Sequence, residues 1–160
     1  KWTRRHLVIE NRHWLDDLPP LRVEDPFTLA HASPRHPVWE YILDLPTALE
    51  NFAHFDTSYC LVGHTHVPAV FALDEASGGV DFALIEHGDV LDLSRHRLIV
   101  NPGGVGQPRD GDPRAAYALL DTEAMRMTFH RVAYDVAATQ ALMREQKLPR
   151  RLIKRLEQGL

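Results

Sequence analysis

The chain has 160 residues, and its hydrophobic (44%) and charged (25%) fractions are those of an ordinary globular domain. A formal net charge of -4 argues against nucleic acid as a partner, because domains that bind nucleic acid are usually basic. No apolar run approaches the roughly 20 residues that span a bilayer, and no apolar segment follows the basic start as a signal peptide requires. We therefore expect no membrane partner.

The single cysteine, Cys60, excludes a disulfide within the chain and favours a reducing, cytoplasmic location. It lies in the apolar run over residues 59–62. We interpret it as a small buried side chain and not as a nucleophile.

Hydrophobic periodicity and turn signals predict a mixed α/β (α+β) order of elements. Helices are predicted over residues 3–18, 47–55 and 136–147, with a last helix that begins at Pro149. Strands are predicted over residues 27–30, 58–62, 67–73, 82–86, 97–100, 115–120 and 125–130, the last two as a hairpin. We expect Thr47 and Glu50 to form a capping box and Asp135 to cap the third helix. The basic residues near the end of the chain are interpreted as a solvated face.

The strongest local signal is the sequence Gly-His-Thr-His at residues 63–66, directly after a predicted buried strand. Glycine permits a sharp turn there, and side chains two residues apart on extended backbone point to the same side. Neutral imidazole is a common ligand of transition metals, so His64 and His66 are candidate ligands of one metal or of two neighbouring metals. A pair of polar turn histidines is the equally weighted alternative. The paired cysteines of classical zinc sites are absent.

His31 repeats this placement, because it follows the predicted strand over 27–30 and enters the loop over 32–37. In layered α/β proteins, ligands gather at the carboxyl ends of strands. Alone, such a histidine is more often a hydrogen-bonded structural residue. Its position relative to His64 makes it a third candidate ligand.

A glycine-rich loop covers residues 101–111 and reads Asn-Pro-Gly-Gly-Val-Gly-Gln-Pro-Arg-Asp-Gly. It is neither a P-loop nor a dinucleotide fingerprint, because it lacks the lysine of the first and the glycine spacing of the second. We interpret its glycines as a structural turn that passes close to other parts of the chain. Whether Arg109 contacts a phosphate group is left open.

The order and spacing of the blocks at residues 29–34, 63–68 and 101–115 resemble the bacterial branch of the calcineurin-like metallophosphoesterase superfamily. The resemblance covers nearly the whole chain. It implies that residues 1–160 are a single partial domain, the C-terminal part of a four-layer α-β-β-α sandwich. It also implies an enzyme that hydrolyses phosphate esters through a hydroxide bridging two divalent transition metals (Mn, Fe, Zn, Ni or Co). His31 and His64 would bind one metal, and His66 would bind the other.

One departure from the family is large. Its motifs Asp-x-His, Gly-Asp-x-x-Asp and Gly-Asn-His-Asp/Glu, which supply the remaining ligands, do not occur in the sequence. Because the chain starts at Lys1 without them, we expect a C-terminal fragment that is inactive alone and binds at most one metal weakly. No catalytic residue is assigned within it.

The resemblance implies a phosphorylated small molecule, a nucleotide or a phosphoprotein as substrate, and a homo-oligomer is compatible with it. Two alternatives stay open. One is a non-catalytic half-domain completed by a partner chain, and the other is a module that binds a single metal ion without hydrolysing anything.

Overall fold

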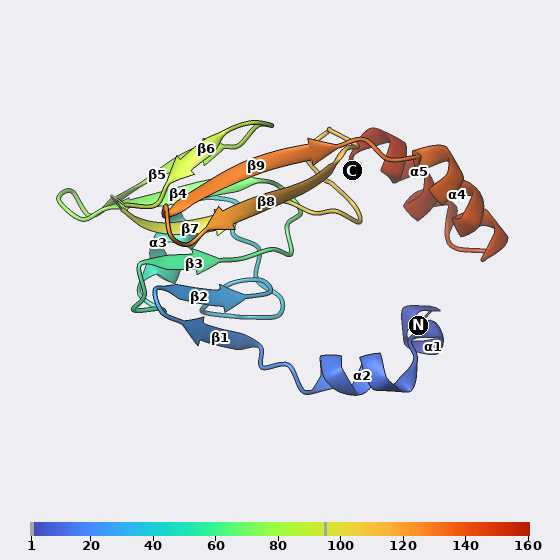
Figure 1. The fold of residues 1–160 in the computed structure, drawn as a ribbon, viewed down its shortest axis with the longest axis horizontal. Coiled ribbons are helices and arrows are strands. Elements are labelled where there is room, and N and C mark those ends of the chain that lie inside the picture. The colour runs from blue at the N-terminus through green and yellow to red at the C-terminus, as the bar shows by residue number, and fades with distance from the viewer. Residues whose placement is uncertain (1, 95) are drawn as a thin grey trace.

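The computed structural model describes residues 2–94 and 96–160 (Figure 1). Lys1, on which part of the expectation of a fragment rests, lies outside the described residues. The helices are α1 (Trp2–His6), α2 (Ile9–Asp16), α3 (Leu45–Phe52), α4 (Val136–Glu145) and α5 (Arg150–Gln158). The strands are β1 (Leu21–Glu24), β2 (Phe27–Ala30), β3 (Tyr59–Leu61), β4 (Ala69–Asp74), β5 (Gly79–Leu84), β6 (Val90–Asp92), β7 (Arg97–Asn101), β8 (Ala115–Asp121) and β9 (Arg126–Val132).

The strands form two sheets, one of six strands in the order β1-β2-β3-β7-β4-β5 and one of three in the order β6-β9-β8. Strands β2, β3 and β7 are parallel neighbours, whereas β1, β4 and β5 are antiparallel to their neighbours. Because β3 lies between two parallel strands, its short apolar run is buried on both faces. The carboxyl ends of β2, β3 and β7 therefore meet at one edge of the large sheet.

Two hydrophobic cores separate the layers. On one face of the six-stranded sheet, α3 contributes Phe52 to a core that includes Cys60 and Phe71. On the other face, Val100 of β7 packs in a core with Phe129 of β9. The described residues thus stack as helix α3, large sheet and small sheet (Figure 1), in agreement with the predicted mixed α+β class.

Most of the predicted elements are present, and Cys60 is fully buried as expected. Burial raises the pKa of its thiol to about 12, so it is not a nucleophile at neutral pH. The hairpin of β8 and β9 is also confirmed. Strands β1 and β6 were missed because both are short and their residues are mostly exposed, so neither shows an apolar pattern.

Two helix predictions need correction. The long first helix is two short helices, α1 and α2, separated at residues 7–8. The capping box at Thr47 is wrong, because the Asp44 carboxylate caps α3 by accepting a hydrogen bond from the Thr47 backbone N–H at 2.8 Å. The Asp135 carboxylate caps α4 as predicted, through the Ala138 N–H at 2.8 Å.

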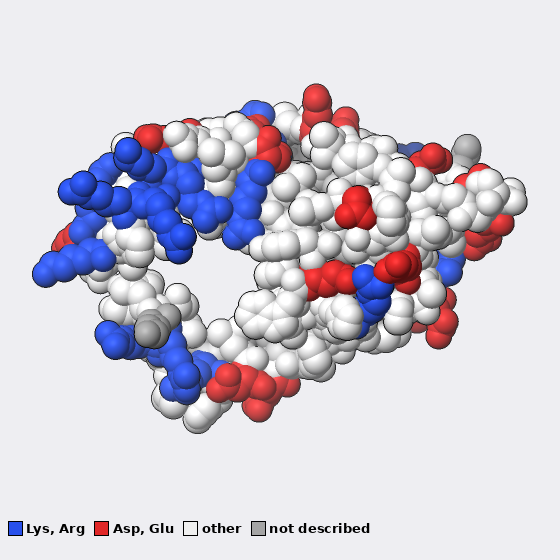
Figure 2. All heavy atoms as spheres, turned by 180° about the vertical axis from the view of Figure 1, so that it is seen from behind, with Lys and Arg blue, Asp and Glu red and all other residues white. Residues whose placement is uncertain are grey.

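The C-terminal helices α4 and α5 pack against each other beyond the end of the sheets (Figure 1). Their basic side chains are mostly exposed, as predicted for a solvated face. Figure 2 shows them gathered over this end of the molecule, separated by an opening from a second basic group at the N-terminal helices. Among the described residues, no helix has the length and apolar character needed to cross a membrane.

A tight turn follows β7 and redirects the chain toward the small sheet. Gly103 has φ +87°, which disfavours any residue with a Cβ. A Cβ on it would lie 2.8 Å from both Ala116 Cβ and Pro68 Cγ. The interpretation of this glycine as a structural requirement is therefore supported.

We expect Gly103→Ala to lower the free energy of unfolding by about 2 to 4 kcal/mol, because backbone strain adds to overpacking. The matched control is Gly106→Ala in the same loop, where a Cβ would meet no atom within 4 Å. The control should change stability by less than about 0.5 kcal/mol. Urea denaturation followed by circular dichroism measures both, and equal effects would contradict this explanation.

Candidate metal centre

All three sequence blocks that carry candidate residues follow the parallel strands. His31 follows β2, residues 63–66 follow β3, and the glycine-rich loop follows β7. Cα pairing of Leu29 with Leu61, and of Leu61 with Val100, places the three strand ends level with one another. The edge of the sheet therefore brings together side chains that are up to 78 residues apart in the sequence, from His31 to Arg109.

His31 and His64 meet directly at this edge. The His31 Nε2 atom lies 2.9 Å from His64 Nδ1, and the ring centroids are 4.7 Å apart. Without a metal, one nitrogen donates a hydrogen bond to the other. Two metal–nitrogen bonds of about 2.1 Å at about 90° would place the nitrogens about 3.0 Å apart. The spacing of this pair therefore fits two adjacent ligands of one metal ion.

His66 is oriented by the glycine-rich loop. Its Nδ1 lies 2.6 Å from the backbone carbonyl oxygen of Gln107. A carbonyl oxygen only accepts hydrogen bonds, so Nδ1 carries the proton and, in the neutral ring, Nε2 keeps a free lone pair. Gly104 permits this approach, since a Cβ there would lie 3.2 Å from His66 Cγ. Metal-binding histidines commonly donate their other N–H to such an oxygen.

The backbone around these histidines is strained. His64 and His66 both have φ 62°, so the extended backbone predicted for these two residues is wrong. This left-handed conformation costs a residue other than glycine about 1 kcal/mol or more. Asn101, which is buried at the end of β7, offsets this cost by fixing the loop. Its Nδ2 donates to the Gly63 carbonyl oxygen at 2.7 Å and to Thr65 Oγ1 at 2.8 Å. The turn between β3 and β4 is thus tied to the neighbouring strand.

Arg109 reaches back over His64. Its Nη1 donates hydrogen bonds at 3.3 Å to the His64 carbonyl oxygen and to the Tyr41 hydroxyl. Its Nε is buried and has no hydrogen-bond partner among the described residues. The guanidinium therefore lies beside the histidine pair and keeps donor capacity that the described residues do not use.

The surroundings of His64 disfavour a positive charge on its ring. Burial lowers the pKa of His64, and electrostatic interactions with His31, Arg109 and His66 lower it further. A hydrogen bond to the backbone of Trp39 acts in the opposite direction. A lowered pKa favours the neutral imidazole, which is the form that binds metals.

The loop between β2 and α3 is held by the carboxylate of Glu40. It accepts hydrogen bonds from Ser33 Oγ at 2.7 Å, from Asn51 Nδ2 at 2.8 Å and from the Arg35 guanidinium. Burial alone would raise the pKa of Glu40, but these hydrogen bonds outweigh it and lower the pKa to about 2. The loop that begins at His31 is therefore fixed to α3 by an ionised, nearly buried group.

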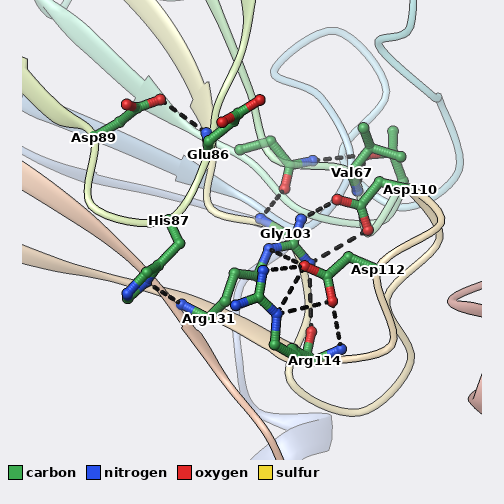
Figure 3. A network of polar contacts seen from close by, with 11 residues as sticks. Val67, Glu86, His87, Asp89, Gly103, Asp110, Asp112, Arg114 and Arg131 are labelled. Atoms are coloured by element: carbon green, nitrogen blue, oxygen red, sulfur yellow. Dashed lines mark hydrogen bonds and ion pairs between the residues drawn. The ribbon is translucent and has the colours of Figure 1, made fainter.

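A second network holds the far end of the glycine-rich loop (Figure 3). The Arg131 side chain on β9 is only 6% exposed and pairs with the Asp110 carboxylate, while its Nε lies 3.9 Å from Asp112. Asp112 in turn accepts from Arg114 Nε at 2.9 Å. The network fixes Asp110, which directly follows Arg109, to the small sheet.

The carboxylates of these networks do not complete a metal site. Among the described residues, no group of three or more His, Cys, Asp and Glu side chains is arranged to bind a metal ion. The His31–His64 pair fits metal binding by its spacing and His66 by its tautomer, but within the described residues the three imidazoles form no single group of this kind and no carboxylate completes the pair. This agrees with the absence of the family's carboxylate-bearing motifs from the sequence.

Sequence reasoning missed several residues at this edge. The aromatic side chains of Trp39 and Tyr41 lie beside His64, and Glu40 between them holds the loop. Asn101 was seen only as part of a turn. A polar residue that directly follows a buried strand and precedes Pro-Gly is a signal for side-chain hydrogen bonding to the backbone, and it could have identified Asn101.

Comparison with known proteins supplies the family. A model of the calcineurin-like phosphoesterase superfamily domain matches residues 19–125. The chain belongs to the calcineurin-like phosphoesterase superfamily. The matched residues include His31, His64, His66 and Arg109.

Three relatives of this chain are longer than it is. The uncharacterized protein MJ0912 of Methanocaldococcus jannaschii is 31% identical over 163 residues, which cover 99% of this chain and 63% of that protein. The crystal structure of a metallophosphoesterase from Sphaerobacter thermophilus is 50% identical with a TM-score of 0.94, covering 99% of this chain and 66% of that one. The hypothetical protein PH1004 from Pyrococcus horikoshii OT3 is 26% identical with a TM-score of 0.72, covering 100% of this chain and 58% of that one. The chain thus spans less than two thirds of each.

We expect Glu40→Gln to destabilise the chain at neutral pH by up to about 3 kcal/mol, given a pKa of about 2 against an ordinary value of 4.5. Because the folded-state pKa is lowered, this stabilisation is present above the unfolded-state pKa and disappears as the pH falls through the folded-state value. Urea denaturation from neutral pH down to the folded-state pKa of about 2 measures the difference in the free energy of unfolding between the variant and the natural sequence.

The control is Glu50→Gln, which removes the other carboxylate that contacts Arg35. Its side chain is 60% exposed, so the loss should stay below about 1 kcal/mol. A Glu40→Gln variant whose stability deficit does not change with pH would refute the proposed role of the ionised carboxylate.

Proposed function

We propose that the whole protein containing this chain hydrolyses phosphate esters with the help of two divalent transition metals. The observation that carries the proposal is the His31–His64 pair, whose nitrogens lie 2.9 Å apart at the carboxyl ends of parallel strands. Membership of the calcineurin-like phosphoesterase superfamily supports it, because proteins of this family generally use divalent metals. The substrate is a phosphorylated small molecule, a nucleotide or a phosphoprotein.

In this proposal, His31 and His64 hold one metal and His66 holds the other. Bound metals would supply an activated water and offset negative charge on the phosphate oxygens. The Gln107 carbonyl oxygen fixes the His66 tautomer that leaves Nε2 free for a ligand. Arg109 binds a phosphate oxygen, because its guanidinium adjoins the histidine pair and a charged guanidinium binds phosphate strongly.

The 160 residues alone should be a weak and incomplete site. Three neutral imidazoles attract a divalent cation far less than a set that includes carboxylates. Robust hydrolysis therefore requires carboxylate ligands from outside the described residues.

Titration calorimetry with Mn²⁺ or Zn²⁺ tests this proposal. We expect the 160-residue chain to bind at most one ion weakly and to hydrolyse no 4-nitrophenyl phosphate, whereas a polypeptide of the relatives' full length binds two ions and is active. His31→Ala or His64→Ala in that polypeptide should weaken metal affinity at least about tenfold, since even outer-shell partners cost 10–100-fold.

The control is His54→Ala, which removes an exposed histidine after α3 and should leave metal affinity unchanged. Two results would overturn the proposal. One is robust turnover by the 160 residues alone, and the other is full metal affinity in both His31→Ala and His64→Ala.

A second candidate is a module that binds a partner chain without catalysis. An apolar hollow of about 580 Å³ lies between α2 and the ends of β2 and β3, and its lining includes Leu15, Leu18, Val38 and His31. A further polypeptide that covers this hollow and supplies carboxylates would complete the site. Co-purification with a second polypeptide that carries an Asp-x-His motif would support this candidate. Metal stoichiometry instead tests the remaining alternative, because a module that binds a single ion stays at one equivalent.

A further inference from the structure

Two aromatic rings flank the histidine pair. The Tyr41 ring stacks on His64, with ring centroids 4.4 Å apart and planes inclined by 17°. The Trp39 ring lies edge-on to the same histidine at 6.4 Å. Trp39 is 79% exposed and Tyr41 is 44% exposed. A wide apolar surface therefore adjoins the candidate metal ligands and is exposed in the part of the chain that the structure describes.

The orientation of these rings is set by the residue between them. The Glu40 side chain points to Ser33, Arg35 and Asn51, whereas the rings on either side of it approach His64. The backbone N–H groups of Trp39 and Glu40 both donate to the His36 carbonyl oxygen, so a turn leads into Glu40 and its anchored side chain restrains the backbone of both neighbours. The exposure of Trp39 thus follows from an anchored loop.

The surroundings of the rings fit a molecule with one anionic and one planar part. Arg109 donates to the Tyr41 hydroxyl, so the aromatic pair adjoins a cation as well as the imidazoles. An aromatic face stacks on any planar π-system, and this stacking is tolerant of the exact base or ring. A sugar or an alkyl group offers no such face.

We propose that Trp39 and Tyr41 form a platform for the organic part of the substrate, and that the site selects phosphate esters with a planar aromatic group, such as a nucleobase. The inference rests on the proposed function for the position of the phosphate. It adds the substrate class and names Trp39 as the specificity-determining residue.

The test uses the full-length polypeptide and two ligands that differ only in the base, AMP and ribose 5-phosphate. We expect AMP to bind about tenfold more tightly than ribose 5-phosphate, because a factor of this size is what one base–aromatic stack contributes to affinity. Trp39→Ala should abolish this preference by weakening AMP alone, and Trp39→Phe should keep part of it. Trp14→Ala, which removes another exposed tryptophan on α2, is the matched control and should change neither ligand.

Binding of both ligands to the natural sequence and to every variant is measured by titration calorimetry, and hydrolysis is measured separately. Equal affinity for the two ligands in the natural sequence, or equal weakening of both by Trp39→Ala, would overturn the platform. If both esters are hydrolysed without a preference for AMP, the platform fails while the proposed function stands. If AMP binds more tightly than ribose 5-phosphate in a Trp39-dependent way but neither ester is hydrolysed, the platform stands and the hydrolase proposal fails.

Discussion

The parallel pairing of β2, β3 and β7 is the constraint on which the candidate site depends. Parallel strands in register end at the same edge, so whatever follows each strand is brought to one place. The segment after β2 begins with a histidine, the segment after β3 contains a pair of histidines, and a glycine-rich loop follows β7. The buried apolar residues of the strands thus bring together polar side chains that lie far apart in the sequence.

The loops at this edge are held from both sides. Glu40 fixes the loop after β2 to α3, and Asn101 fixes the loop after β3 to β7. Arg131 fixes the glycine-rich loop after β7 to the small sheet. Each tie is a buried or nearly buried polar group with satisfied hydrogen bonds, which fixes geometry more strictly than apolar packing does. The left-handed backbone of His64 and His66 is maintained within this frame.

The sequence was sufficient for much of the fold, for a physical reason. Strands such as β3 and β7 are continuous apolar runs, and α4 carries a visible Asp135 cap, so local chemistry dictates each element. The short, exposed β1 and β6 are defined by pairing with neighbours, which no local pattern records. At the site, histidines after strand ends were visible, whereas Trp39 and Tyr41 gain their roles only through the anchored loop between them.

The most direct test of the account is anomalous diffraction at the manganese edge from crystals of the full-length polypeptide grown with Mn²⁺. The account predicts an anomalous peak within about 2.3 Å of both His31 Nε2 and His64 Nδ1, in place of the hydrogen bond between them. A structure in which manganese binds elsewhere, while these two nitrogens still share a proton, would contradict it.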